Sequence, residues 1–277
     1  MAGPVVNTAD TAHRPKIAIG FFGLARSLKW TLPSIKENII APAREVGDVR
    51  LFAHLYKQTH ITNPRSGEDD PLDPEEYRLL ECDEVQLEEP GRCLEEARYE
   101  WILSHGDAFH DGGKSLANLI HQLHSLQVVG QMIDIWHPDV VVLVRPDLYY
   151  HDSLKTVIYE HTKQPSARIS LPIWQWYGGY NDRFAVCGRL SFKSYTNRLD
   201  FVATYLHKTG GPLPAERFLK FSLHQQGIQP DAFSLRASRV RANGKIVEEN
   251  FKPASLMKKL RRKIDFYFFQ SKKFFFE

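Results

Sequence analysis

Short apolar runs alternate along this chain with longer segments whose apolar residues are spaced as on a helix. Residues 16–22 (KIAIGFF) and 49–55 (VRLFAHL) predict two strands. Between them, apolar residues at 32, 35, 39 and 40 predict a helix over 32–40, with Pro33 in its first turn. A strand, a helix and a second strand within the first 55 residues are typical of an α/β fold.

Five consecutive apolar residues at 140–144 predict a strand that is buried on both faces. Arg145, Pro146 and Asp147 follow it directly. Open α/β sheets bind ligands where the carboxyl ends of their strands open into a crevice, so we expect these residues at an active-site edge. The alternative is an ordinary turn with a capping aspartate and a solvated arginine.

The remaining pattern predicts one α/β domain with a mixed, mostly parallel central sheet flanked by helices. The most regular helix is expected over 115–136, and residues 57–74 are expected to form a long polar loop. Further strands are predicted at 84–87, 168–173, 184–187, 233–241 and 245–247, and further helices at 73–80, 91–104, 199–206 and 215–227. The domain would span 15–250, between a loose tail at 1–14 and a distinct segment at 251–277.

Residues 23–27 (GLARS) follow the first predicted strand. A glycine at this place lets the backbone turn tightly and approach a ligand, and Arg26 would stand at the mouth of the same crevice, where its guanidinium suits a phosphate. Alternatively, Gly20 and Gly23 only permit the turn, since the segment matches neither GxGxxG nor GxxxxGK[ST].

Aromatic and polar residues gather over 174–183 (WQWYGGYNDR), which we call the aromatic segment. They suit the stacking of a sugar or a base, whereas packing in the core and a plain turn are the alternative roles. The candidates in this segment are Trp174, Trp176, Tyr177, Tyr180, Asn181, Asp182 and Arg183.

Two further features could carry chemistry. Glu216 begins the helix predicted over 215–227, where it is either a catalytic base or an anion stabilised by the helix dipole. His121 and His124 lie three residues apart on the predicted helix 115–136. Such a pair can share a metal, but with no third ligand in view hydrogen bonding or solvation is the better interpretation.

Composition limits the binding partners and the cellular compartment that we expect for this chain. A net charge of +3 gives no case for general nucleic-acid binding, and Cys82, Cys93 and Cys187 form no CxxC pair, which favours free thiols and a reducing, cytoplasmic compartment. The N-terminus has no signal peptide pattern, and no apolar run is long enough to span a bilayer. Basic and aromatic residues are interleaved over 256–277, which predicts either peripheral membrane contact on the cytoplasmic face or a helix docked on its own domain or a partner.

The order of these motifs resembles GT-A-type glycosyltransferases that use nucleotide sugars, of the kind found in bacterial and viral surface-polysaccharide assembly. The resemblance covers about residues 16–250. It rests on the succession GLAR, SIKENII, FAHLY, QLHSLQ, VVVLVRPDL, GGYNDRFAV and PAERFLKFSLHQQGI.

The resemblance implies a Rossmann-related GT-A fold that binds a nucleoside-diphosphate sugar and a glycan or lipid-linked saccharide acceptor. Gly23, Arg26, Arg145 and Asp147 would then face the diphosphate, and the aromatic segment would bind the donor sugar or the acceptor. Asp147 would hold Mn²⁺ or Mg²⁺. The family's Asp-x-Asp is Arg-Pro-Asp here, and one carboxylate beside an arginine binds a dication less well than two, so Arg145 could replace the metal.

Three functions follow from these residues. The first is an inverting glycosyltransferase with Glu216 or Asp182 as the general base. The second is a sugar nucleotidyltransferase, which needs a more basic loop than GFFGLARS. The third is a non-catalytic relative that binds glycans or a membrane-associated complex, which the missing first acid of the metal motif favours. The donor, the acceptor and the oligomeric state are not encoded in these patterns.

Overall fold

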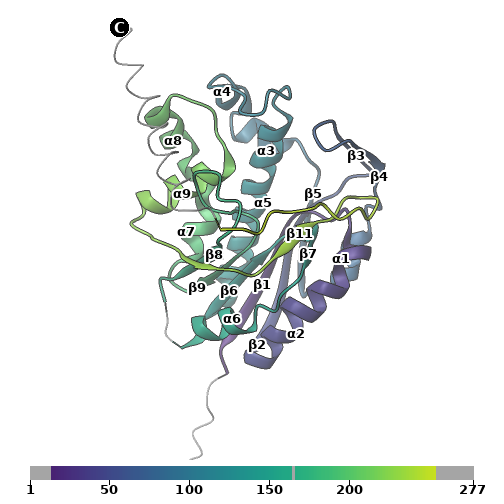
Figure 1. Cartoon of the computed structure of the whole chain (residues 1–277), viewed down its shortest axis with the longest axis vertical. Helices are drawn as coiled ribbons and strands as arrows, with labels where there is room; N and C mark the ends of the chain where they lie inside the picture. Colours follow the sequence, from purple (N-terminus) through teal and green to yellow (C-terminus); the bar gives the residue numbers. More distant parts are fainter. Residues whose placement is uncertain (1–13, 164–165, 254–277) are drawn as a thin grey trace, which may run out of the picture.

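The computed structural model describes residues 14–163 and 166–253, so the predictions for the tail before residue 14 and for the basic segment 256–277 lie outside the described residues (Figure 1). Its centre is a seven-stranded sheet in the order β10-β8-β9-β6-β1-β2-β5. The strands are β1 (Lys16–Leu24), β2 (Asp48–Tyr56), β5 (Glu84–Glu88), β6 (Val140–Val144), β8 (Ile169–Pro172), β9 (Ala185–Gly188) and β10 (Asp231–Phe233). This confirms the predicted α/β class with a mixed, mostly parallel sheet.

Strand β6 lies at the centre of this sheet, and all five of its side chains are fully buried. It pairs in parallel with β1, which continues in parallel to β2 and β5, and it pairs antiparallel with β9. The predicted strand buried on both faces is therefore confirmed, and it marks the border between the parallel and the antiparallel part of the sheet.

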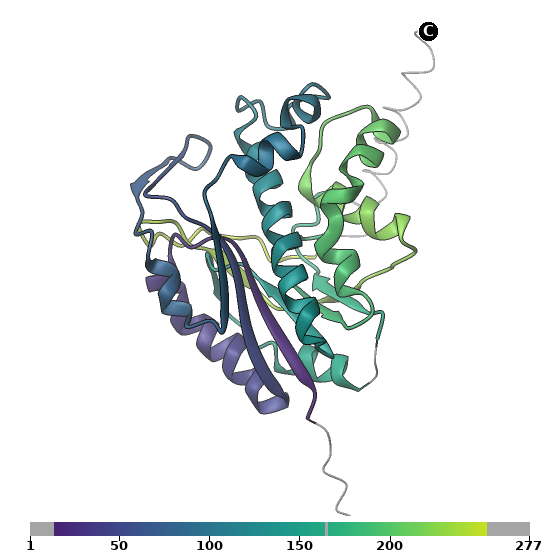
Figure 2. The ribbon, with the colours of Figure 1, turned by 180° about the vertical axis from the view of Figure 1, so that it is seen from behind.

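Alternate side chains of the central strands point to two separate helical layers, as the period of two along a strand requires. Ile17 and Val142 pack toward a layer of α1 (Leu28–Ile35), η1 (Lys36–Ile40), α2 (Ala41–Val46) and α6 (Lys155–Thr162). Ala18 and Val141 face the layer of α5 (Lys114–Trp136), α7 (Phe192–Thr196) and α9 (Ala215–Gln225), seen from behind in Figure 2. Gly20 permits close packing here, because a Cβ atom would stand 2.8 Å from the Cδ1 of Ile133 on α5.

The remaining helical turns cover the upper part of the second layer and the ends of the sheet (Figure 1). Leu206 and Phe218 belong to a smaller core cluster, which joins α8 and α9 to the start of α5. The remaining elements are α3 (Arg92–Glu96), α4 (Tyr99–Leu103), η3 (Asn197–Phe201) and α8 (Val202–Thr209). The short helix η2 (Glu76–Leu80) instead packs against α1 in the first layer.

Several predicted boundaries were wrong. The first helix begins at Leu28 instead of residue 32, so Pro33 lies inside it. The expected loop 57–74 contains the hairpin β3 (His60–Asn63) and β4 (Glu68–Pro71), in which Asp69 accepts hydrogen bonds from Thr62 and pairs with His60. Its residues are polar on both faces and gave no alternating apolar pattern.

The closing segment also differs from the prediction of one long strand. Residues 233–241 are divided between β10 and β11 (Ala237–Arg239), and β11 leaves the main sheet to pair with β7 (Leu148–Tyr150). The predicted strand at 245–247 contributes a single bridge between Val240 and Ile246. This pairing carries Arg239 and Arg241 back over the end of β6.

Two simpler expectations concern the cysteines and the membrane. Cys82, Cys93 and Cys187 are all free thiols, as predicted. Within 14–163 and 166–253, no helix combines the length and the hydrophobicity that crossing a bilayer requires.

Candidate functional site

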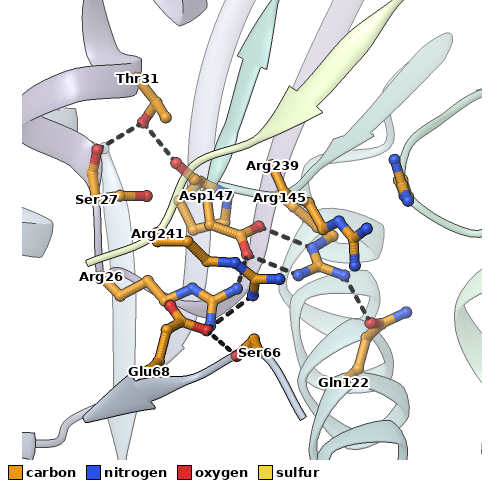
Figure 3. A network of polar contacts seen from close by, with 12 residues as sticks. Arg26, Ser27, Thr31, Ser66, Glu68, Gln122, Arg145, Asp147, Arg239 and Arg241 are labelled. Carbon is orange, nitrogen blue, oxygen red and sulfur yellow. Dashed lines mark hydrogen bonds and ion pairs between the residues drawn. The ribbon is translucent and has the colours of Figure 1, made fainter. Parts of the chain in front are cut away.

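Charged side chains gather at the carboxyl ends of β1 and β6. These strands are parallel neighbours with Phe21 opposite Val144, so the residues that follow them emerge at the same edge. Arg26 comes from the turn after β1, and Arg145 and Asp147 come from the turn after β6 (Figure 3). Gly23 makes the first turn possible, because its φ of 102° lies in the region that favours glycine, and its N–H donates to the Oγ of Ser125.

Asp147 is held between two arginines and is almost fully buried. Arg145 donates to both carboxylate oxygens, over 2.9 Å from Nε and 2.7 Å from Nη2, and Arg26 donates from Nη2 over 2.6 Å. Burial alone would raise the pKa of Asp147, but the charges and hydrogen bonds of these two arginines lower it below its usual range. Asp147 is therefore an anion whose oxygens are engaged by cations.

This geometry argues against the metal-binding role for Asp147. A dication at its carboxylate would lie beside two guanidinium groups, and it would have to displace the hydrogen bonds that they donate. Of the two alternatives that the Arg-Pro-Asp motif left open, the arrangement favours arginine as the partner of an anion.

The hairpin contributes a second acid to the same cluster. Glu68 of β4 is 2% exposed, and its Oε2 accepts from Arg26 over 3.3 Å and from Arg241 over 2.8 Å. Ser66 donates to the same oxygen over 2.6 Å (Figure 3). The Nε of Arg26 and the Oε1 of Glu68 are buried without a hydrogen-bond partner among the described residues.

A third acid, Glu249, binds a further pair of arginines. Its Oε1 lies 3.0 Å from Nη1 of Arg183 and 2.8 Å from Nε of Arg239, and its side chain is 1% exposed. Burial lowers the pKa of Arg183, as do the nearby charges of Arg239 and Arg145, while Glu249 opposes this. The two arginine groups therefore act on each other within one electrostatic network.

Gln122 of α5 connects this network to the opposite side of the edge. Its Oε1 accepts from Arg145 Nη1 over 3.2 Å, and its Nε2 donates to Asp182 Oδ2 over 2.8 Å. Asp182 lies in the loop before β9, and its charge acts in turn on Glu216. A continuous series of contacts thus leads from Arg26 to Asp182, and the field of Asp182 reaches Glu216.

Glu216 stands in the first turn of α9 in a different electrostatic state from Asp147. Burial raises its pKa to about 7, the negative charge of Asp182 adds to this, and Arg183 and Arg65 oppose it only in part. Its backbone carbonyl accepts from the N–H of Tyr180 over 2.9 Å. Gly179 is required for this approach, because a Cβ atom there would lie 1.7 Å from the same carbonyl oxygen.

The aromatic segment is divided between the core and the surface. Trp174 is fully buried, with its indole N–H donating to the carbonyl of Leu235, and Tyr180 is buried with its hydroxyl 2.9 Å from His224 Nε2. Asn181 is buried and fixes the loop by donating to the carbonyl of Trp174. These three side chains have the structural role that was the alternative prediction.

The other aromatic side chains are more accessible. Tyr177 is 51% exposed, and Trp176 is half-buried with its indole N–H donating to the carbonyl of Pro172. A role for them in sugar binding stays a prediction. Arg183 lies over the ring of Trp174, 4.9 Å from its centroid, which connects the buried part of the segment to the arginine network.

A small hollow of about 50 Å³ lies between the starts of α5 and α9, and Ala215, but not Glu216, is among the residues that line it. Phe109, Leu116, Leu213 and Ala215 are among the residues that line it, so it is largely apolar. The arginines of the network do not line it. The arginines are therefore connected to Glu216 only indirectly: hydrogen bonds of Gln122 lead from Arg145 to Asp182, and the charge of Asp182 acts on Glu216.

Five residues of the network were not identified from the sequence: Glu68, Gln122, Arg239, Arg241 and Glu249. Gln122 lies on α5, where the sequence pattern shows an apolar stripe and gives no sign of a polar role for this position. The others lie in a hairpin and a closing segment whose paths the sequence did not reveal. The available signal was compositional, namely three arginines at alternate or nearly alternate positions over 236–241.

The histidines of α5 are separated by their contacts. His121 accepts from the N–H of Gly91 through Nε2 over 3.2 Å, while the Nε2 of His124 lies 2.9 Å from Glu88 Oε2. They do not meet at a common point, which agrees with the expectation of hydrogen bonding for this pair. His124 instead lies close to two residues of other elements, His54 of β2 and Glu88 of β5.

Neither a protein-family model nor a curated protein sequence matches the chain. Its fold has counterparts of low similarity among solved structures. Mouse xyloside xylosyltransferase 1 aligns with a TM-score of 0.42 and 12% identity, over 80% of this chain and 85% of that one. The galactosyltransferase LgtC, solved with donor and acceptor sugar analogues, aligns with a TM-score of 0.42 and 8% identity, over 74% and 69% of the two chains.

A third structure, the glycosyltransferase GlyE of Streptococcus pneumoniae, aligns with a TM-score of 0.40 and 9% identity. The alignment covers 80% of this chain and 45% of that one. These structures resemble the chain in backbone path alone, with TM-scores near 0.4, so the function has to be argued from the residues of the site.

Proposed function

We propose that the chain is a glycosyltransferase that moves a sugar from a nucleoside-diphosphate sugar to a hydroxyl group of a glycan or lipid-linked saccharide. The observation that carries this proposal is an excess of arginine at the sheet edge, next to a carboxylate whose pKa burial raises to about 7. The first feature suits a diphosphate leaving group, and the second suits a base that must accept a proton near neutral pH.

The charge balance supports an anionic ligand. Five arginines, at 26, 145, 183, 239 and 241, make ion pairs with only three carboxylates, at 68, 147 and 249. Asp182 joins this network through the amide of Gln122, and its charge also acts on Arg145. The arginines exceed the ion-paired carboxylates by two, and by one when Asp182 is counted. This positive surplus suits the diphosphate of a nucleotide sugar, and buried arginines retain their charge. The Nε of Arg26, which has no hydrogen-bond partner within the described part of the chain, is a further buried donor in this cluster.

The reaction then has a balanced course. Glu216 accepts the proton of the acceptor hydroxyl, whose oxygen forms a bond to the anomeric carbon of the sugar. The bond between that carbon and the diphosphate oxygen breaks, and the oxygen leaves with the electron pair. Arg26 and Arg145 neutralise the charge that develops there, as cationic clamps do in other transfers of phosphate-bearing groups. Because attack and departure occur on opposite faces, the configuration inverts.

Asp147 has a positioning role in this scheme. Its carboxylate holds the guanidinium groups of Arg26 and Arg145 in place, so both are ordered before the donor binds. Arginine supplies the neutralisation that the family's metal would give, and the proposal therefore expects transfer without added Mn²⁺ or Mg²⁺.

The test begins with binding. The melting temperature of the full chain is measured with a panel of nucleoside diphosphates, each with and without MnCl₂. At a concentration 100 times the dissociation constant, a ligand stabilises the folded state by about 2.7 kcal/mol. We expect a clear increase with one nucleotide, with or without manganese, and a much smaller one for an Arg26→Gln variant.

The matching sugar nucleotides are then incubated with the chain and a panel of saccharide acceptors, and products are followed by mass spectrometry. A glycoside whose mass has increased by one sugar supports the proposal. The absence of stabilisation by any nucleotide would overturn it in favour of a non-catalytic binding protein. Stabilisation by nucleoside triphosphates alone would favour a nucleotidyltransferase.

A further inference from the structure

A second polar cluster lies on the β5 side of the sheet, apart from the arginine network. His54 of β2, Glu88 at the end of β5 and His124 of α5 each offer one ligand atom, and these atoms lie within 4.8 Å of one another. His54 is fully buried, whereas the side chains of Glu88 and His124 are 21% and 17% exposed. None of the three has a part in the proposed transfer.

The hydrogen bonds of Ser125 fix the tautomer of His54. The Oγ of Ser125 donates its single proton to the carbonyl of His54 over 2.7 Å, and it accepts from the N–H of Gly23 over 2.8 Å. His54 Nδ1 lies 2.9 Å from the same oxygen, and with the hydroxyl proton directed at that carbonyl this nitrogen is the donor of the contact. The proton of a neutral His54 ring is therefore on Nδ1, and its Nε2 bears a lone pair.

That lone pair points at another acceptor. Nε2 of His54 lies 3.2 Å from Oε2 of Glu88. A lone pair and a carboxylate oxygen at this distance repel each other unless a proton or a metal ion lies between them. The contact between this buried nitrogen and the carboxylate is therefore a place where a bound cation is favoured.

The spacing also suits a metal ion. In a tetrahedral zinc site with ligands at about 2.0 to 2.1 Å, neighbouring ligand atoms are about 3.3 Å apart. The corresponding separations here are 3.2 Å between His54 and Glu88 and 2.9 Å between His124 and Glu88. Ser125 takes the place of the outer partner that holds a metal-binding imidazole in the required tautomer. Glu88 and His124 are partly exposed, so the fourth ligand would be a water from the solvent.

We propose that His54, Glu88 and His124 form a binding site for a divalent cation of the zinc class, which connects β2, β5 and α5. Two imidazoles and one carboxylate favour zinc over magnesium or calcium, which prefer oxygen ligands. Ser125 contacts both His54 and the N–H of Gly23, so the site is coupled to the turn that carries Arg26. Its primary effect is on stability, because the three elements are joined at a place where α5 meets the edge of the sheet.

The test uses the tag-free full chain after treatment with a chelator and dialysis. Zinc chloride is titrated in by calorimetry without any nucleotide, so the outcome does not depend on the proposed transferase function. We expect one zinc ion per chain, an increased melting temperature, and a visible absorption band of four-coordinate cobalt when Co²⁺ replaces zinc. His124→Ala and Glu88→Gln should each weaken zinc binding by at least about 100-fold, more than loss of an outer partner does.

His121→Ala is the matched control. It removes a histidine one turn away on the same helix, whose Nε2 is engaged by Gly91, and it should leave zinc binding within about twofold of the wild type. Ser125→Ala keeps all three ligands and should weaken binding by about 10- to 100-fold. The absence of saturable zinc uptake by the wild type would overturn the proposal. So would unchanged affinity in both ligand variants, or a loss of affinity in the His121 variant as large as in His124→Ala.

Discussion

Asp147 and Glu216 are two carboxylates of one polar network, and their environments drive their pKa values in opposite directions. Asp147 is enclosed by Arg26 and Arg145, and its pKa lies below the usual range. Glu216 is partly buried, but its strongest charged neighbour is the anion of Asp182, and its pKa is raised to about 7. Burial is common to both, so the sign of the neighbouring charge makes the difference.

The difference assigns separate roles to the two acids. A carboxylate whose pKa is strongly lowered holds a proton too weakly to act as a base at neutral pH, and it serves best as a fixed counter-ion. A carboxylate with a pKa near the working pH can accept a proton and release it again. One network thus combines a preformed cationic cluster with a carboxyl group whose pKa is raised, and variants of both acids test whether their proposed roles are distinct.

The largest expected effect is on turnover. Glu216→Gln removes the proton acceptor while keeping the shape of the side chain, so the rate of sugar transfer should fall by about 10²- to 10⁴-fold. The measurement is kcat with the donor identified by the nucleotide panel, together with circular dichroism to verify the fold. Glu160→Gln is the control, because Glu160 lies on α6, in the other helical layer, and forms an exposed ion pair with Lys163. Near-normal turnover in the Glu216 variant would contradict its role and transfer the assignment to Asp182.

The second effect is on stability. Asp147→Asn removes the carboxylate that pairs with Arg145 and one of the two that pair with Arg26, which should lower the free energy of unfolding by about 3 to 5 kcal/mol. Asp152, which is close to Asp147 in the sequence, forms a more exposed ion pair with Arg236. Asp152→Asn breaks this pair and should lower the free energy of unfolding by less than about 1 kcal/mol. Urea denaturation of both variants at pH 7 gives the comparison. Equal small losses would show that the arginines do not depend on Asp147.

The pH dependence of this contribution has a defined sign. Because the pKa of Asp147 is lower in the folded state, its stabilisation is complete above the unfolded pKa of about 3.8 and is lost as the pH falls toward the folded value. The loss should be absent from the Asp147→Asn variant over the same acidic range.

Glu216 should show the opposite dependence. Its folded pKa of about 7 exceeds the ordinary value of 4.5, so the folded state retains a proton that the unfolded state has released, and stability falls as the pH rises between these values. Glu216→Gln removes this penalty and should raise the free energy of unfolding at pH 8 by up to about 3 kcal/mol, with little change at pH 4. Urea denaturation at both pH values measures it. A variant that is less stable than the wild type at pH 8 would mean that Glu216 is held mainly by favourable contacts.

Much of this fold is determined by patterns that extend over single elements. Val140 to Val144 could only be a buried strand, and the stripe on α5 and the turn at Gly23 were equally local signals. Because parallel strands end at a common edge, the same patterns were enough to bring Arg26 and Asp147 together.

The rest of the site depends on where distant segments return. Glu68 reaches Arg26 through a polar hairpin, and Arg241 arrives with a strand of three residues that pairs with β7. Neither hairpin nor short strand has an apolar period, so their pairing is set by tertiary contacts. Likewise, the sequence could not reveal that Trp174 is buried and Tyr177 exposed, since both are aromatic and only three positions apart.

The smallest expected effect tests the charge that separates the two acids. Asp182→Asn preserves a side-chain oxygen that can accept from Gln122 but removes the negative charge that raises the pKa of Glu216.

In the wild type, kcat/KM should rise with pH through about 7 as Glu216 loses its proton. In the variant, this rise should move to lower pH by on the order of one unit, with a modest change in the maximal rate. The profile is measured between pH 5 and 9 with the same donor. The control is Asp200→Asn, which removes the charge of an acid that accepts a hydrogen bond from Gln127 on the exposed side of α5. A large fall in the maximal rate without a shift of the profile would mean that Asp182 accepts the proton itself, and Glu216 would then be the residue whose charge adjusts it.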